Sequence, residues 1–268
     1  AVLSCSVGLF MYVTVHLRQD ARVVCGYARR ENVEATYALE NKILRAALMR
    51  VRFDHGIEVH LISEMPGESS GMGGSAAVLC ATLAALYRMR GLVIDPDLLA
   101  TRAASVEIDD LKRSVGRQDH WGAAFGGFQQ LTFSGDRVQR FSLDTDLLRF
   151  LDGAVWLVSC QTIHPRDAGE VLLTQIKSEN ASAADRLGRI ANLMLTTVRA
   201  QDLASVIALL AEVWELKRGL SSGVSTPEVD AVITAIRELG GAGKLCGAGG
   251  HGYVLAIVPP TRGADVLR

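Results

Sequence analysis

The alternation of apolar and polar residues along the chain predicts several β-strands. The segment SVGLFMYVTVHL (6–17) is rich in β-branched and aromatic residues, which favour strands. GIEVHLISEM (56–65) alternates apolar with polar side chains and is expected to be a half-buried strand. Three further segments have strand character: FQQLTFSGD (128–136), AVWLVSC (154–160) and YVLAIVPP (253–260).

Helical spacing separates these strands. In NVEATYALENKILRAALMRV (32–51) apolar residues recur at intervals of three and four, which is the period of an amphipathic helix. Another helix, VLCATLAALYRMR (78–90), follows a glycine-rich loop, and Asp95 with Pro96 has the form of an N-cap and first turn for a third. Later helices are expected over 168–179, 183–199 and 201–217, and from Pro227 to Gly240.

The order of these elements predicts an α+β fold with two lobes. Strands and helices interleave without a regular βαβ rhythm, and the sequence changes in character near Asp152. We therefore place an N-terminal lobe at residues 1–150 and a C-terminal lobe at residues 151–268. Of the 268 residues 49% are hydrophobic and 21% charged, which suffices for a proper core and argues against disorder.

The charge balance and the lack of a long apolar run narrow the classes of partner. Lys and Arg number 28 against 29 Asp and Glu, so the net charge is −1 and no overall basic field would gather nucleic acid. No apolar run reaches the roughly 18–20 residues that a membrane-spanning helix needs. We therefore expect neither a nucleic acid nor a membrane as partner.

The cysteines indicate a reducing compartment. Cys5, Cys25, Cys80, Cys160 and Cys246 are scattered and form no C-x-x-C pair, so reduced thiols are favoured over disulfides or a zinc site. A secretion signal has a basic segment followed by an apolar one, and the first residues lack such a basic segment. A cytoplasmic protein is expected.

The glycine-rich loop PGESSGMGGSAA (66–77) is the strongest candidate for a binding site. It lies directly before a helix, whose free N–H groups and positive dipole end attract an anion. Three interpretations remain: a tight turn that needs small residues, a dinucleotide site, and a nucleoside triphosphate site without a Walker A motif, since no G-x-x-x-x-G-K-[ST] occurs. In the third interpretation, Ser75 offers a hydroxyl oxygen to Mg²⁺.

The dinucleotide interpretation has some support in the sequence. Gly71, Gly73 and Ala76 satisfy G-x-G-x-x-A between a strand and a helix, and Asp95 follows about 20 residues later. However, LVID (92–95) is too short for a confident second parallel strand and is followed by another helix. GAGGHG (247–252) matches G-x-G-x-x-G but precedes a strand, so it cannot seat a pyrophosphate at a helix start.

Two motifs resemble those of the GHMP small-molecule kinases. The loop is similar to the family's phosphate loop, P-x-x-x-G-L-G-S-S-A-A, with one extra residue after Pro66, Met72 in place of Leu and Gly74 in place of the first Ser. KLCGAGGHG (244–252) is similar to the family's late motif, K-x-x-G-A-G-G-G-G, with His251 in place of a glycine. The two motifs occur in the family's order, about 170 residues apart.

A third segment, GRQDHWGAAFGGF (116–128), resembles the G-K-Q-D-Q-Y-A-A-A-F-G-G motif of the family's sugar 1-kinases, typified by the heptose 7-phosphate kinases. The resemblance implies a two-lobed α+β fold with an N-terminal ribosomal-protein-S5-like lobe and a C-terminal ferredoxin-like lobe. It also implies a kinase that uses ATP and Mg²⁺ to phosphorylate the anomeric hydroxyl of a small-molecule sugar or sugar phosphate. A homodimer is a candidate assembly.

The resemblance implies roles for individual residues. Asp119, expected in a loop, would be the catalytic base that takes the proton of the sugar hydroxyl. Ser75 and Glu107 would bind Mg²⁺. The nucleotide would be bound by Ser69, Ser70, Gly71, Met72, Gly73, Gly74, Ser75 and Ala76. The sugar would be bound by Arg117, Asp119, Arg166, Gly249 and Gly250.

Two alternatives to a sugar kinase stay open: a non-catalytic relative that binds nucleotide or sugar, and an NAD(P)-dependent oxidoreductase, which is less favoured. Gly74, His251 and the start of the chain support the first alternative. Relatives begin with a segment ending in G-G-G-T-D, and this sequence starts just after the corresponding position. We expect that segment to be missing either from this sequence or from the natural protein.

Overall fold

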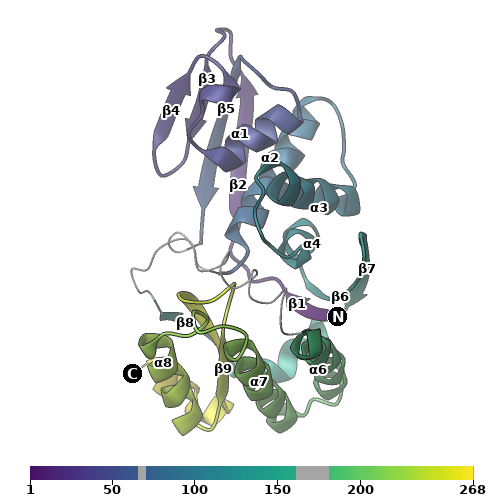
Figure 1. The fold of residues 1–268 in the computed structure, drawn as a ribbon, viewed down its shortest axis with the longest axis vertical. Helices are drawn as coiled ribbons and strands as arrows, with labels where there is room; N and C mark the ends of the chain where they lie inside the picture. Colours follow the sequence, from purple (N-terminus) through teal and green to yellow (C-terminus); the bar gives the residue numbers. More distant parts are fainter. Residues whose placement is uncertain (66–70, 161–180, 268) are drawn as a thin grey trace. The chain divides into compact units, whose positions relative to one another are not determined.

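The structure, a computed structural model, describes residues 1–65, 71–160 and 181–267. The chain divides into two compact units (Figure 1). The N-terminal unit comprises Ser6–Gly67 and Gly73–Gly126, and the C-terminal unit comprises Ala1–Cys5, Glu68–Met72 and Gly127–Arg268. Residues 127–150, which the sequence assigned to the N-terminal lobe, therefore pack with the later part of the chain.

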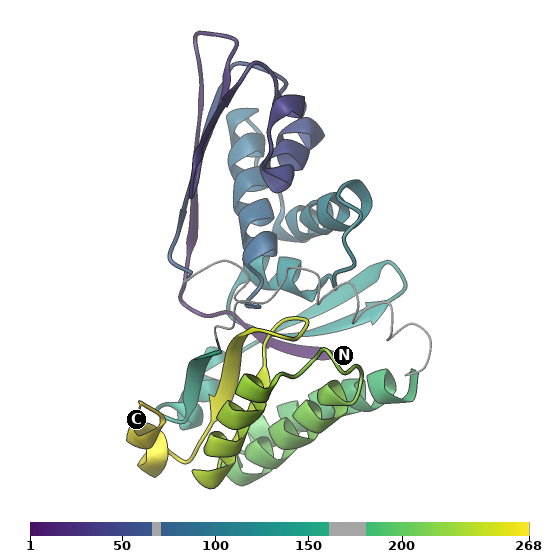
Figure 2. The same cartoon turned by 60° about the vertical axis from the view of Figure 1, so that its left-hand side comes forward.

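A four-stranded sheet forms one layer of the N-terminal unit. Its order is β2 (Met11–Leu17), β5 (Ile57–Ser63), β3 (Val23–Gly26) and β4 (Arg30–Val33). β5 is antiparallel to β2 and parallel to β3. The helices of the unit lie against one face of this sheet, as the rotated view in Figure 2 shows.

The helical layer of this unit consists of α1 (Lys42–Arg50), α2 (Gly74–Met89), α3 (Pro96–Ser105) and α4 (Gln118–Phe125), with a short 3₁₀ turn at Thr36–Ala38 and a π-helical turn at Val106–Asp110. Leucines of α1 and α2 pack with Ile57 and Val59 of β5 in one apolar core. α2 also packs against both α3 and α4. The core therefore fixes the helix that begins directly after the glycine-rich loop.

Among its described residues, the C-terminal unit contains two three-stranded sheets. One has the order β1 (Val2–Cys5), β6 (Phe128–Ser134) and β7 (Arg137–Leu143), and the other β8 (Val155–Cys160), β10 (Gly252–Ile257) and β9 (Ala242–Leu245). Every strand pair in both sheets is antiparallel. 3₁₀ turns lie at Thr145–Leu151 and Pro260–Leu267.

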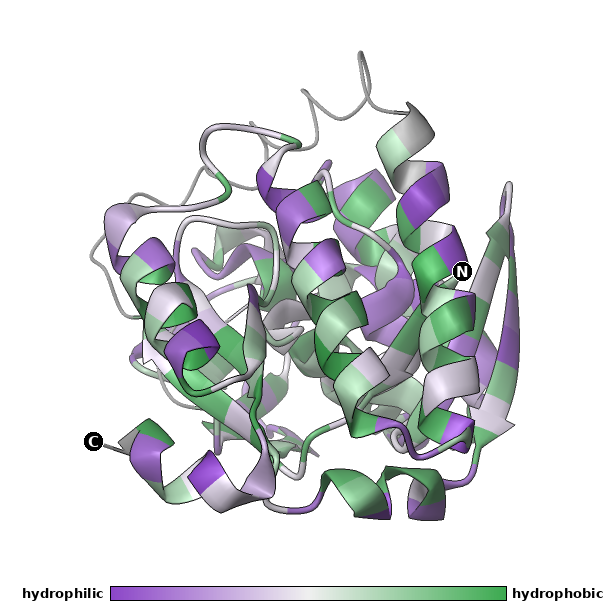
Figure 3. Cartoon of the chain, turned by 90° about the horizontal axis from the view of Figure 1, so that it is seen from below, coloured by the Kyte–Doolittle hydropathy of each residue, from purple (hydrophilic) through white to green (hydrophobic). Residues whose placement is uncertain are grey.

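In the part of this unit that the structure describes, the helices are α6 (Ala181–Arg199), α7 (Leu203–Arg218) and α8 (Pro227–Glu238). Figure 3 colours the residues by hydropathy, and hydrophobic and hydrophilic residues alternate along the helices. Trp214 of α7 is fully buried and packs in a core with Leu245 of β9 and Val254 of β10. α7 is thereby held against the end of β9. No helix among the described residues is both long and apolar enough to cross a lipid bilayer.

The structure confirms the α+β fold and most of the predicted elements. β5, β6 and β8 lie within the predicted strand segments, and β10 begins one residue before its segment. Asp95 caps α3 by accepting hydrogen bonds from the N–H groups of Asp97 and Leu98. The helix predicted over 32–51 begins only at Lys42, because Arg30–Val33 pairs with β3 and Asn41 caps α1. The predicted strand 6–17 is a strand only from Met11. The helix predicted over 168–179 lies outside the described residues.

We expect Leu83→Ala to lower the free energy of unfolding by about 2–5 kcal/mol, because truncating a buried leucine leaves a cavity. Leu83 of α2 has no exposed surface and belongs to the core of the N-terminal unit. Urea titration measures the loss. Val93→Ala is the matched control, since Val93 is 81% exposed, and it should change stability by less than about 0.5 kcal/mol. Similar losses in the two variants would contradict the assigned core.

Candidate active site

The N-terminus of α2 has the features of an anion site. Its N-cap is Gly73, which adopts the left-handed conformation (φ 74°, ψ 24°) and makes no side-chain capping bond. Gly74, Ser75 and Ala76 form the first turn, where backbone N–H groups have no partner within the helix. Together with the positive end of the helix dipole, these N–H groups favour a negatively charged group in front of the helix.

Asp119 lies directly against the backbone at this helix start. A Cβ atom on Gly73 would be 3.2 Å from the Cβ of Asp119 and 3.4 Å from its Cγ. Only glycine both tolerates the positive φ and leaves this space open. Asp119 lies in the first turn of α4, so the prediction that it lies in a loop was wrong. The segment before Gly126 and Gly127, expected to be a loop, is the short helix α4.

α4 is anchored on the side that faces its neighbouring helices. The indole Nε1–H of Trp121, a residue only 4% exposed, donates to Oδ1 of Asp97 in α3 at 3.1 Å. The next residue towards the N-terminus, His120, is also buried, at 1% exposed. Two consecutive buried side chains fix the rotation of α4 about its axis, and they thereby fix where Asp119 lies.

Glu107 is a buried carboxylate held by three side chains. It lies in the π-helical turn and is 1% exposed. His120 Nε2 is 2.9 Å from its Oε2, and Arg113 Nη1 donates to its Oε1 at 3.0 Å. Burial by itself would raise the pKa of Glu107, but hydrogen bonds from His120, Ser75 and Arg113 outweigh it and hold the pKa below its ordinary value. Glu107 is therefore ionised at neutral pH.

The pair formed by Ser75 and Glu107 fits Mg²⁺ chemically. The Ser75 hydroxyl, in the first turn of α2, is hydrogen-bonded to the Glu107 carboxylate, so two hard oxygen atoms lie together beside the anion site. Mg²⁺ is usually bound through one or two protein oxygens, with phosphate and water completing its shell. No group of three or more His, Cys, Asp or Glu that could hold a metal occurs in the part of the chain that the structure describes.

The later glycine-rich segment packs, within the C-terminal unit, against Gly71 of the loop 66–77. Because this loop resembles the phosphate loop of the GHMP kinases, it is called the phosphate loop below. A Cβ on Gly71 would be 2.8 Å from the carbonyl oxygen of Cys246, and one on Gly247 would be 2.7 Å from Cα of Gly71. Both glycines have positive φ, 74° and 68°. The two backbones therefore touch without intervening side chains, an approach that other residues would block.

Two family models match this chain, one to each half. The model of the GHMP kinases N terminal domain covers residues 36–127, and that of the GHMP kinases C terminal domain covers 194–268. The chain belongs to the GHMP kinase family. As a GHMP kinase it is an ATP-dependent phosphotransferase, and the dinucleotide interpretation is not favoured. In agreement, Asp95 follows no strand and serves as the cap of α3.

Curated relatives include sugar and mevalonate kinases. D-glycero-alpha-D-manno-heptose 7-phosphate kinase of Campylobacter jejuni is 23% identical over 100% of this chain and 84% of its own length. A mevalonate kinase of Methanothermobacter thermautotrophicus is 29% identical over 76% of this chain and 65% of its own length. This GHMP kinase thus spans most of the first relative and somewhat less than two thirds of the second.

Solved structures share the fold of this GHMP kinase. A D-glycero-D-manno-heptose 1-phosphate kinase of Bacteroides thetaiotaomicron has a TM-score of 0.74 at 21% identity, covering 99% of this chain and 82% of that one. Galactokinase of Lactococcus lactis in complex with galactose has a TM-score of 0.79 at 13% identity, covering 98% and 81%.

The structure brings together some of the predicted site residues of the GHMP kinase. Ser75, Glu107 and Asp119 gather around the start of α2, and Arg117 is the N-cap residue of α4. Gly249 and Gly250 pack against Val224 in the C-terminal unit, Gly250 donating to its carbonyl at 3.0 Å. Ser69, Ser70 and Arg166 lie outside the described residues. The sequence analysis missed His120 and Arg113, whose only signal was their closeness to Asp119 and Glu107 along the chain.

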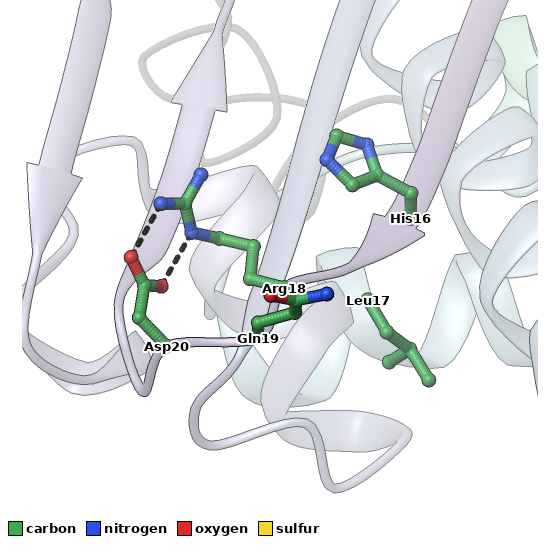
Figure 4. A pocket seen from close by; sticks show the side chains of 5 residues that line it. All are labelled: His16, Leu17, Arg18, Gln19 and Asp20. Atoms are coloured by element: carbon green, nitrogen blue, oxygen red, sulfur yellow. Dashed lines mark hydrogen bonds and ion pairs between the residues drawn. The ribbon is translucent and has the colours of Figure 1, made fainter.

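A pocket lined by His16–Asp20 does not belong to this site. It lies at the turn after β2, where the Arg18 guanidinium pairs with the Asp20 carboxylate (Figure 4). In the antiparallel pair of β2 and β5, Leu17 is opposite Ile57, whereas the phosphate loop follows the other end of β5, after Ser63. The pocket and the phosphate loop are thus at opposite ends of the strand pair.

We expect the stability of the protein to depend on Glu107 in the acid range. A carboxylate whose folded pKa is lowered adds stability above its ordinary pKa, 4.5 here, and loses this contribution as the pH falls through the folded pKa. The difference in unfolding free energy between wild type and Glu107→Gln should be largest above pH 4.5 and shrink below it. Urea titrations at a series of pH values measure this difference.

The control for this experiment is Asp109→Asn, which removes an exposed carboxylate from the same π-helical turn. As a substitution of an exposed side chain, it should change the free energy of unfolding by less than about 0.5 kcal/mol. A difference between wild type and Glu107→Gln that is the same at all pH values would contradict an ionised, hydrogen-bonded Glu107.

Proposed function

We propose that this GHMP kinase transfers the γ-phosphate of ATP to the anomeric hydroxyl of a sugar or sugar phosphate. The observation that carries the proposal is the packing of Asp119 against Gly73, which puts a carboxylate next to an anion-binding helix start. The buried Glu107 and its bond to Ser75 add a site for the metal of the nucleotide. The similarity to heptose kinases supports a sugar as acceptor.

The phosphate loop would bind the triphosphate mainly through backbone N–H groups. Gly71, Met72, Gly73, Gly74, Ser75 and Ala76 carry these groups, and we assign Ser69 and Ser70 to the same loop. Ser75 and Glu107 would hold Mg²⁺ through their side-chain oxygens. Bound there, Mg²⁺ would neutralise charge on the phosphate oxygens. His120 and Arg113 would keep the Glu107 carboxylate in place.

Asp119 would act on the acceptor. Phosphoryl transfer depends mostly on positioning and charge stabilisation, with a carboxylate to orient the hydroxyl and take its proton. As the oxygen of the sugar bonds to phosphorus, its proton would pass to a carboxylate oxygen of Asp119. The anchoring of α4 through Trp121 and His120 supports this role, because it restricts the position of that carboxylate.

The sugar itself would be bound by groups around Asp119 and by the later glycine segment. We assign Arg117 and Arg166 to an anionic group of the substrate, such as a phosphate, and Gly249 and Gly250 to close approach of the substrate to the backbone. The heptose 7-phosphate kinase relative makes a seven-carbon sugar phosphate the first substrate to test. We place the enzyme in the cytoplasm, where its five free cysteines would stay reduced.

The test of this function is turnover with MgATP against a panel of sugars and sugar phosphates. Asp119→Asn keeps the shape of the side chain but removes its basicity, so kcat should fall by about 10²–10⁴-fold. The affinity for MgADP, measured by titration calorimetry, should change little. If wild type phosphorylates no sugar in the panel, the substrate class is wrong. If Asp119→Asn keeps full turnover on the best sugar, Asp119 is not the base.

Gly73→Ala should reduce turnover by displacing Asp119, and Gly91→Ala provides a matched control. Both glycines have φ close to 75°, so either alanine should cost about 1–2 kcal/mol of backbone strain. Only at Gly73 would the new Cβ press on Asp119, since nothing lies within 4 Å of a Cβ at Gly91. We therefore expect similar losses in melting temperature but a fall in kcat for Gly73→Ala alone. Equal kcat values would argue against the contact with Asp119.

A further inference from the structure

Lys217 is a half-buried lysine that the mechanism above does not use. It lies in the last turn of α7 in the C-terminal unit. Its Nζ donates to the carbonyl oxygen of Leu245 at 2.7 Å and to that of Gly247 at 2.6 Å. One side chain therefore holds two backbone carbonyls that flank Cys246, where the chain leaves β9.

The segment that Lys217 holds is the one on which the phosphate loop rests. The carbonyl of Cys246 and the backbone of Gly247 contact Gly71 so closely that a Cβ on either glycine would clash. From the other side, the N–H of Cys246 donates to the carbonyl of Tyr253 at 2.8 Å. The hairpin between β9 and β10 and the amine of Lys217 together fix the surface under Gly71.

We propose that Lys217 is a positioning residue for nucleotide binding: by holding the carbonyls of Leu245 and Gly247, it sets the backbone against which Gly71 of the phosphate loop packs. The inference rests on the proposed function, since it assumes that this loop binds the phosphates of a nucleotide. Loss of Lys217 would leave two carbonyls without their donor and let the segment relax away from Gly71.

The charge of Lys217 gives the proposal a second readout. Burial is the main cause that lowers its pKa, to about 7, and the nearby cation Lys244 of β9 lowers it further, while Cys246 acts in the opposite direction. An anion bound at the phosphate loop would favour the protonated form. Binding of a nucleotide near pH 7 is therefore accompanied by uptake of part of a proton at Lys217.

The experiment compares Lys217→Met, Lys217→Arg and Arg218→Gln with wild type. Lys217→Met removes the donors, and KM for MgATP should rise about tenfold, as expected for the loss of hydrogen bonds that hold the loop. KM for the sugar should stay within about twofold of wild type. Lys217→Arg retains donors for both carbonyls and should restore part of the affinity. Arg218→Gln removes an exposed cation from the same turn, paired with Asp230, and should behave as wild type.

Titration calorimetry with MgADP provides the readout that a purely structural lysine would not affect. In two buffers of different ionisation enthalpy, near the pKa of Lys217, wild type should take up a fraction of a proton on binding. Lys217→Met should lose that uptake. Unchanged KM for MgATP together with a lowered melting temperature, or proton uptake that persists in Lys217→Met, would overturn the proposal.

Gly247→Ala, alone and combined with Lys217→Arg, keeps the proposal testable if Lys217→Met does not fold. The added Cβ would press on Gly71 from the segment that Lys217 holds, so it should weaken MgADP binding in the same way. The double variant should be less impaired than the product of the single effects, because both act on one contact. Additive effects would show that Lys217 acts elsewhere. Failure to phosphorylate any sugar would overturn the proposed function but leave these nucleotide affinities measurable.

Discussion

The buried negative charge of Glu107 is the constraint from which the arrangement of the N-terminal unit follows. An ionised carboxylate removed from water is unfavourable by several kcal/mol unless hydrogen bonds and a cation compensate it. Here the compensation comes from three segments of the chain: Ser75 at the start of α2, Arg113 in the loop after the π-helical turn, and His120 in α4. The same bonds that make the charge tolerable therefore tie these segments together.

This tie also accounts for the position of Asp119. Asp119 and His120 are consecutive in α4, so their side chains point in directions about 100° apart around the helix axis. With His120 on Glu107 and Trp121 on Asp97, only one rotation of α4 remains, and it lays Asp119 against Gly73. A structural carboxylate thus determines where a second carboxylate, the proposed base, can act.

The sequence predicted the backbone elements well where the signal is local. The apolar alternation of 56–65, the cap formed by Asp95 and the glycine loop before α2 are properties of a few neighbouring residues, and all were recognised. The pair of β3 and β4 was missed. Arg30–Val33 is a mostly polar edge strand, and its own residues have little strand propensity; it is a strand because it pairs with Val23–Gly26. Likewise, Asn41 lies inside the segment predicted as helical, but it is the N-cap at which α1 begins.

The predicted site divides in the same way. Ser75, Glu107 and Asp119 were found through motif resemblance, but their contacts were not. The hydrogen bond from His120 to Glu107 joins residues 13 positions apart, and Glu107 lies in a π-helical turn that no spacing rule anticipates. The partners of Lys217 are 28 and 30 positions away, in a strand end that only the packing of α7 on β9 brings close. Polar residues at such distances carry no periodic signal.

The glycines of the phosphate loop lose much backbone entropy on folding, and their contacts show why glycine is needed there. Gly71 and Gly73 both have φ of 74°, and a single residue, Met72, separates them. Gly71 is fixed by the backbone of Cys246 and Gly247 within the C-terminal unit, and Gly73 by Asp119 within the N-terminal unit. Each contact excludes a Cβ, so each glycine is required by a different part of the chain. The loop is held by two independent close approaches, and a side chain at either position would disturb the backbone of the proposed nucleotide site.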